Sequence, residues 1–267
     1  MTASITARNN KDIIKKASFA IIAVIFWIGL WWVASILIGE DLRLFLPSPF
    51  AVAKTLVSLV ATKDFWTATL LTILRIFAGF ILGAMAGIVS GMLTSHIKIA
   101  DAILSPALKI IRAVPVVSFI ILAFLFMSID ALPIFISFLM VTPLVWQSTH
   151  DALQNSCKEL EEMGRVFKMG ALAILFKIKL PSITGEIITA LVTGLGFAWK
   201  SGVAAEVLYS PNISIGKNIY IAKANLDFSG VYAYTLTVVA LSLVIEILLK
   251  RLCGRYLLNA ERGKANA

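Results

Sequence analysis

Charged residues are scarce in this sequence. Asp, Glu, Lys and Arg make up 15% of its 267 residues and 59% are hydrophobic, so that the mean hydropathy is +0.91. A soluble domain of this length has a large surface to cover with polar side chains, and this composition does not supply them. Long apolar runs in such a chain indicate transmembrane helices.

Residues that carry enzyme chemistry are also few. Cys157 and Cys253 lie far apart and fit no disulfide or zinc spacing, and neither His96 nor His150 has clustered Cys or carboxylate neighbours. The sequence contains no Ser/His/Asp set and no GxxxxGK[ST] loop that would cradle phosphates. We therefore expect a chain that is not an enzyme, binds no metal or cofactor of its own, and does not itself hydrolyse ATP.

Basic residues punctuate the apolar sequence. The net charge is +9, but Lys and Arg lie between the apolar runs rather than along one face, which is typical of membrane topology and not of nucleic-acid binding. Ala17–Gly39 holds 23 uncharged residues, longer than the apolar region of a signal peptide, and predicts a retained first span.

The apolar runs predict an all-α polytopic membrane protein with one transmembrane domain over 17–252, between an N-terminal tail, 1–16, and a basic tail, 253–267. Because Lys and Arg gather in the tails and in every second connection, both termini are expected in the cytoplasm of a multi-pass cell (plasma or inner) membrane protein. About six spans are expected, near 17–38, 65–94, 113–127, 131–148, 187–209 and 230–249.

A ladder of four glycines runs through the second predicted span. Gly79, Gly83, Gly87 and Gly91 recur every fourth residue, which removes side chains from one stripe of a helix. In lipid such a stripe lets a second helix approach closely. We therefore predict a helix-packing role for these four positions.

Three ionisable residues fall inside predicted spans, where charge is costly and often functional. They are Arg75, Lys200 and Glu206, and we take them as candidates for a translocation pathway. Six residues along a helix is a rotation of about 240°, so Lys200 and Glu206 are not expected to pair. Lys200 could face the pathway and attract an anion, or it could snorkel outward or pair with another span. Arg75 could lie at the outer mouth.

A polar insert, 151–181, interrupts the apolar sequence between the fourth and fifth predicted spans. It resembles the cytoplasmic loop of permease subunits of ATP-binding-cassette (ABC) importers, which reads Glu-Ala-Ala, three residues, Gly, nine residues, Ile-x-Leu-Pro. Glu162 is followed at that spacing by Ile178, Leu180 and Pro181, whereas Met163, Gly164 and Lys168 depart from the two alanines and the glycine.

Further segments extend the resemblance from Leu46 to Leu252: LPSPFAVAKTL, TILRIFAGFILGAMAGIVSGML, IIRAVPVVSFIILAFLF and GLGFAWKSGVAAEVL. They are similar to the nitrate, sulfonate, taurine and thiamine-precursor branch of these permeases. The resemblance implies a type I (MetI-like) importer permease that works as a pair of identical copies. It also implies two cytoplasmic ATPase subunits, which bind ATP and Mg²⁺, and an extracytoplasmic solute-binding protein. It implies that the insert contacts the ATPase through Glu162, Met163, Gly164, Phe167, Lys168, Gly170, Ile178, Leu180 and Pro181.

Two other classes of protein predict different features. A self-contained secondary carrier or channel predicts inverted repeats with interrupted helices and a paired ion site, and neither is evident in the sequence. A membrane scaffold gives no reason for the glycine ladder and the spaced insert to occur together. The transported solute is not encoded in a recognisable motif, and Lys200 favours an anion.

Overall fold

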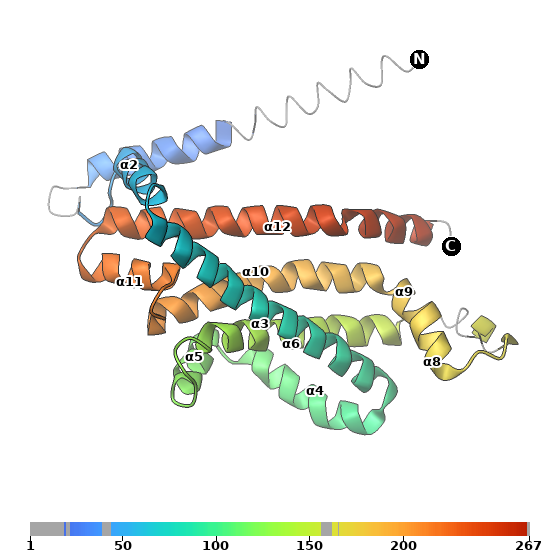
Figure 1. The fold of residues 1–267 in the computed structure, drawn as a ribbon. Coiled ribbons are helices and arrows are strands. Elements are labelled where there is room, and N and C mark those ends of the chain that lie inside the picture. The colour runs from blue at the N-terminus through green and yellow to red at the C-terminus, as the bar shows by residue number, and fades with distance from the viewer. Residues whose placement is uncertain (1–18, 20–21, 39–43, 156–161, 165, 266–267) are drawn as a thin grey trace, which may run out of the picture.

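The computed structural model describes residues 19, 22–38, 44–155, 162–164 and 166–265. Within these ranges every regular element is a helix and none is a strand (Figure 1). Besides the helix Ile22–Leu37, the elements are α2 (Pro49–Val60), α3 (Lys63–His96), α4 (Lys98–Ala113), α5 (Val116–Phe124), α6 (Leu132–Gln154), α8 (Ala171–Ile174), the π-helix η2 (Leu175–Lys179), α9 (Leu180–Ser182), α10 (Thr184–Tyr209), α11 (Ile215–Ala224) and α12 (Phe228–Ala265).

The predicted all-α membrane architecture is confirmed. Four helices are long and apolar enough to cross a membrane, namely α3, α6, α10 and the 228–252 part of α12, and the bent pair α4–α5 adds a fifth candidate. The first predicted span includes Ile22–Leu37, but most of its first residues lie outside the described ones, as does the predicted tail 1–16. Residues 253–265, predicted as a tail, continue α12 as helix.

The third predicted span, 113–127, differs from the structure. It contains α5, whose 9 residues extend about 14 Å, less than half of a bilayer core. The chain bends by 103° between α4 and α5. Pro115 explains the bend, because its ring holds the preceding Val114 in an extended conformation (ψ 134°) and the proline offers no N–H to continue α4.

The glycine ladder of α3 lies against α6. A Cβ added at Gly87 would lie 2.8 Å from the Thr142 carbonyl oxygen and 2.7 Å from Val145 Cβ, closer than real Cβ atoms approach. An added Cβ at Gly83 would come equally close to the residues four positions earlier on α6, and one at Gly91 to the residues four positions later. The two helices therefore run parallel with their backbones in direct contact, as small residues permit in membranes.

Two ends of the molecule can be distinguished in Figure 1. α2 and α11 lie at one end, here called the α11 end. α8, α9 and the last turns of α12 lie at the other, here called the insert end. α10 joins the ends and packs on α3, α6, α11 and α12.

Candidate functional site

The insert lies at the insert end of the molecule (Figure 1). Its residues Asp151–Gln154 are the last turn of α6, and residues 156–161 and 165 lie outside the described residues. The Gly164 backbone packs on the side chains of Ile174 and Ile178: an added Cβ would lie 2.9 Å from Ile178 Cδ1. Gly164 and Ile178 are both positions of the motif. Their contact holds the first half of the insert against the second.

Three apolar side chains of the insert project from it. Met163, Val166 and Phe167 are 49%, 79% and 73% exposed, and Glu162, Lys168 and Gly170 beside them are also exposed. Leu180 and Pro181 belong to α9, which continues η2 without a break. The insert therefore presents an apolar patch, Met163–Val166–Phe167, with charged neighbours.

Lys168 has the left-handed backbone conformation, with φ 55°. The Met169 N–H donates to the Gly164 carbonyl oxygen at 3.0 Å, and the Phe167 N–H to the Met163 carbonyl oxygen at 3.1 Å. The first bond closes a helix end in the manner of a Schellman motif, with Lys168 at the position that favours glycine. Lys168 occupies the position at which the ABC importer loop has glycine, the residue that adopts this conformation most readily.

Lys168→Gly is expected to stabilise this helix end by about 1 kcal/mol, because a side chain in the left-handed region is disfavoured by that amount. Hydrogen exchange of the peptide 163–170, followed by mass spectrometry, should slow about fivefold. Gly170→Ala is the control, since an added Cβ there meets nothing within 4 Å. Faster exchange in Lys168→Gly would contradict the assignment.

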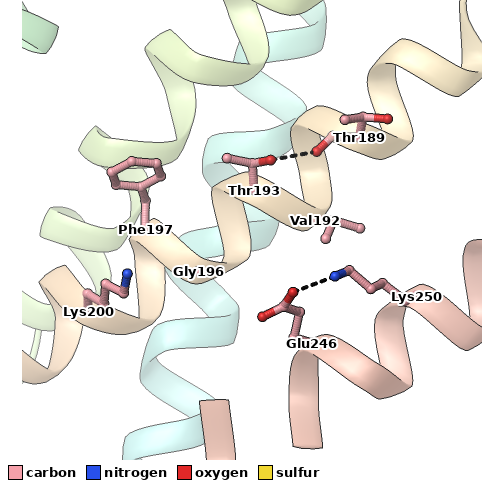
Figure 2. A pocket seen from close by; sticks show the side chains of 8 residues that line it. All are labelled: Thr189, Val192, Thr193, Gly196, Phe197, Lys200, Glu246 and Lys250. Carbon is pink, nitrogen blue, oxygen red and sulfur yellow. Dashed lines mark hydrogen bonds and ion pairs between the residues drawn. The ribbon is translucent and has the colours of Figure 1, made fainter. Parts of the chain in front are cut away.

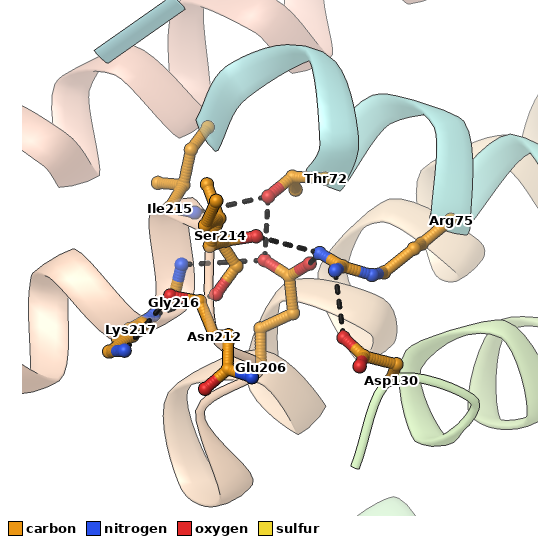
Figure 3. A network of polar contacts seen from close by, with 10 residues as sticks. Thr72, Arg75, Asp130, Glu206, Asn212, Ser214, Ile215, Gly216 and Lys217 are labelled. Atoms are coloured by element: carbon orange, nitrogen blue, oxygen red, sulfur yellow. Dashed lines mark hydrogen bonds and ion pairs between the residues drawn. The ribbon is translucent and has the colours of Figure 1, made fainter. Parts of the chain in front are cut away.

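A polar network occupies the α11 end (Figure 3). Glu206 of α10 is fully buried. Its Oε2 accepts hydrogen bonds from Thr72 Oγ1 at 2.8 Å and from the Gly216 N–H at 3.4 Å, and its Oε1 lies 3.6 Å from Arg75 Nη1. A buried carboxylate is costly unless it is paired and hydrogen-bonded, and here it is both.

Arg75 extends the network to two further segments. It donates to the Ile213 carbonyl oxygen and to Asp130 Oδ1, both at 2.8 Å, while the Ile215 N–H donates to Thr72 Oγ1 at 3.0 Å. α3, α10, the turn before α6 and the start of α11 are thereby tied together. The network fixes the α11 end of the bundle.

The sequence reasoning missed most of these partners. It singled out neither Asp130 nor Thr72, although Thr72 lies three residues before Arg75 on the same face of a helix. That spacing was the available signal. The backbone groups of 213–216 have no sequence signature.

Lys200 lies apart from this network, as its rotation from Glu206 implies. It lines a cavity of about 610 Å³ between α10 and α12 (Figure 2). The cavity is also lined by Glu246 and Lys250, an i,i+4 pair on α12 in which Lys250 Nζ lies 2.6 Å from Glu246 Oε1. The other lining residues are Thr189, Val192, Thr193, Gly196 and Phe197.

The three predicted pathway residues are thus divided: Arg75 and Glu206 contact each other, and Lys200 lines a separate cavity. In the described part of the chain, no three His, Cys, Asp or Glu residues are grouped so that they could hold a metal ion.

Comparison with known proteins identifies the family. The model of the binding-protein-dependent transport system inner membrane component family matches residues 79–256. A protein of Methanocaldococcus jannaschii that bears the name of an ABC transporter permease is 24% identical over 253 residues, which cover 93% of this chain and 92% of the relative.

Two relatives are named for a solute. A bicarbonate transport system permease protein of Synechococcus elongatus is 24% identical, covering 68% of this chain and 66% of its own. A permease protein of Bacillus subtilis named for aliphatic sulfonate transport is 26% identical, covering 71% and 70%.

The fold is that of a solved importer. The structure of the MetNI methionine ABC transporter in inward-facing conformations contains a chain that superposes with a TM-score of 0.63 at 16% identity, covering 72% of this chain and 96% of that one. The resemblance noted in the sequence is confirmed, and with a family match over more than half of its length this chain belongs to the binding-protein-dependent transport system inner membrane components, as an importer-type ABC permease subunit.

Proposed function

We propose that this chain, as a homodimer, forms the solute pathway of an ATP-driven importer for a small anion. Two separate ATPase subunits, which bind ATP and Mg²⁺, dock on the cytoplasmic inserts, and an extracytoplasmic solute-binding protein delivers the solute at the α11 end. Both chain termini are then cytoplasmic. The observation that carries this proposal is the exposed patch Met163–Val166–Phe167 on an insert that matches the spacing of the ABC importer loop.

The patch has the composition of a protein-binding surface. Apolar side chains in its centre and charged ones, Glu162 and Lys168, at its edge match the core and rim of protein interfaces, where aromatic residues contribute most of the affinity. The packing of Gly164 on Ile174 and Ile178 fixes the segment that carries the patch against the second half of the insert. A partner that binds Phe167 therefore acts on the whole insert.

The insert is connected to the cavity of Lys200 through nearly continuous helix. α8, η2 and α9 follow one another without a break, and only Ile183 separates α9 from α10. A displacement of the insert by the ATPase is therefore transmitted to α10, which carries Lys200. This connection supplies a physical route from ATP hydrolysis to the solute pathway.

The anion assignment rests on Lys200 and on two relatives. Bicarbonate and aliphatic sulfonates, for which those relatives are named, are both small oxyanions. Lys200 is exposed in its cavity, and a lysine within a membrane span attracts negative charge. A neutral or cationic solute on the cognate binding protein, tested by thermal-shift screening, would contradict this assignment.

Phe167→Ala is expected to weaken ATPase binding about tenfold, since it removes the largest exposed apolar side chain of the patch. Affinity is measured by titrating the purified ATPase against the permease in nanodiscs, together with solute-stimulated ATP hydrolysis in the presence of the loaded binding protein.

Glu162→Gln, at the first residue of the motif, is expected to reduce coupled uptake while the permease still reaches the membrane.

Phe50→Ala provides the matched control. Phe50 lies in α2, outside the insert, and is 80% exposed, similar to Phe167. Wild-type ATPase binding and coupled uptake in Phe167→Ala, or an equal loss in Phe50→Ala, would show that the patch is not the ATPase dock.

A further inference from the structure

The outward face of α10 is more polar than the outward faces of its neighbours. On α3 the exposed side chains include Leu74, Ile81, Met85 and Val89, and on α12 they include Val239, Leu243 and Ile247. On α10 they are Thr189, Thr193, Phe197, Lys200 and Leu208, of which three are polar. Lipid covers the first two faces at no cost, but polar groups within a span face water or protein.

A second cavity extends this polar face towards the insert end. It measures about 310 Å³ and shares Thr189 and Thr193 with the cavity of Lys200. The two cavities therefore adjoin along one face of α10. The other residues that line the second cavity are Arg112 at the end of α4, Leu144, Gln147, Ser148 and Asp151 of α6, and Ala190.

Each cavity contains one carboxylate that is already engaged and one cation that is not. Lys250 pairs with Glu246 in the first, and Gln147 Nε2 donates to Asp151 Oδ2 at 2.7 Å in the second. Among the residues that the structure describes, Lys200 and Arg112 have no hydrogen bond or ion pair with the protein.

The threonines between the two cations keep this face wettable. Thr189 Oγ1 donates to the Gly185 carbonyl oxygen at 2.9 Å. Thr193 Oγ1 donates to the Thr189 carbonyl oxygen at 3.0 Å (Figure 2). Their hydrogens are satisfied within the helix, while the oxygens remain free to accept from water. A hydrated solute can therefore lie along the face without competing for these groups.

We propose that Arg112 and Lys200 are two successive binding positions for a small oxyanion that moves along α10. Lys200 attracts the anion as a point charge, and the planar guanidinium of Arg112 fits carboxylate-like or sulfonate oxygens in a bidentate manner. This proposal rests on the proposed function only for the direction in which the anion moves. Attraction of an anion by these residues requires no ATPase.

The test uses cysteine reactivity along this face in the permease–ATPase complex in nanodiscs. Thr193→Cys, in a background with Cys157→Ser and Cys253→Ser, is treated with 2-sulfonatoethyl methanethiosulfonate and with the cationic trimethylammonium analogue. The anionic reagent is expected to react faster once the rates are normalised to those with a free thiol. Arg112→Gln and Lys200→Gln should each lower the ratio of anionic to cationic rates by roughly tenfold, the effect of a nearby charge in a partly hydrated site.

Lys109→Gln is the matched control. Lys109 lies one turn before Arg112 on α4, is exposed, and lines neither cavity, so the same change of net charge there should leave the ratio within twofold. Gly196→Cys, where an added Cβ meets nothing within 4 Å, reports on the same cavity if Thr193→Cys does not fold.

Three results would overturn the proposal. The first is that neither reagent reacts with Thr193→Cys or with Gly196→Cys. The second is that the ratio of anionic to cationic rates is unchanged in both Arg112→Gln and Lys200→Gln. The third is that this ratio falls equally in Lys109→Gln. Repeating the assay in phosphatidylglycerol tests whether a lipid headgroup uses these cations instead. The ratio should match that in phosphatidylcholine, and its loss would assign the cations to lipid. A failure of ATPase docking in Phe167→Ala leaves these ratios unaffected, so the two proposals fail separately.

Discussion

Gly87→Ala is expected to destabilise the permease by about 2 kcal/mol, although it adds only one methyl group. The added carbon would lie 2.8 Å from the Thr142 carbonyl oxygen and 2.7 Å from Val145 Cβ, so the backbones of α3 and α6 must separate along their contact. Gly87→Leu is expected to prevent the two helices from packing at all. Thermal unfolding of the purified permease in detergent, with gel filtration of the Leu variant, measures both effects.

Gly29→Ala is the control for this experiment, because an added Cβ at Gly29 meets nothing within 4 Å. It is expected to change stability by less than about 0.5 kcal/mol. If Gly87→Leu gave a monodisperse permease with the wild-type unfolding midpoint, the close contact of α3 with α6 would be wrong.

Arg75→Met is expected to lower the free energy of unfolding by about 3–5 kcal/mol, because it leaves the buried Glu206 carboxylate without its cation. The side chain of Arg75 is only 15% exposed and that of Glu206 is 0% exposed. The double variant Arg75→Met/Glu206→Gln removes the charge that would be left alone and is expected to recover part of the loss. Thermal unfolding of the single and double variants measures the difference.

The exposed pair of Glu246 and Lys250 offers the contrast. Lys250→Met breaks an ion pair whose side chains are 44% and 56% exposed, and exposed pairs contribute less than about 1 kcal/mol. A loss in Arg75→Met no greater than in Lys250→Met, or a double variant less stable than Arg75→Met, would refute the structural role of the network.

Local patterns predicted the long helices closely. The apolar run at 65–94 became α3 at Lys63–His96, and the run at 187–209 became α10 at Thr184–Tyr209, because span length and composition are fixed by the bilayer. The run at 113–127 has the same composition but contains Pro115 near its start, and the bend there depends on how α4 and α5 pack. Hydropathy measures apolar content and not helix direction.

The candidate site was less accessible to sequence reasoning. The insert was found by the spacing from Glu162 to Pro181, which is local. The network was not, because its hydrogen bonds join residues 134 and 138 positions apart, from Thr72 to Glu206 and from Arg75 to Ile213. Arg112 is one of the basic residues between apolar runs, and nothing local indicates that it lines a cavity with α10.

The contact of α3 with α6 has a repeat on both sides. The glycines recur every fourth residue, and so do the carbonyl groups and Cβ atoms that they meet, from Phe138 through Thr142 to Trp146. A slide by one residue would drive a side chain into the facing backbone, whereas a slide by a full turn, about 5–6 Å, would restore the fit. The pair therefore behaves as a ratchet with a coarse step: when the permease changes the side from which its pathway is open, these two helices must move as one body or jump a whole turn.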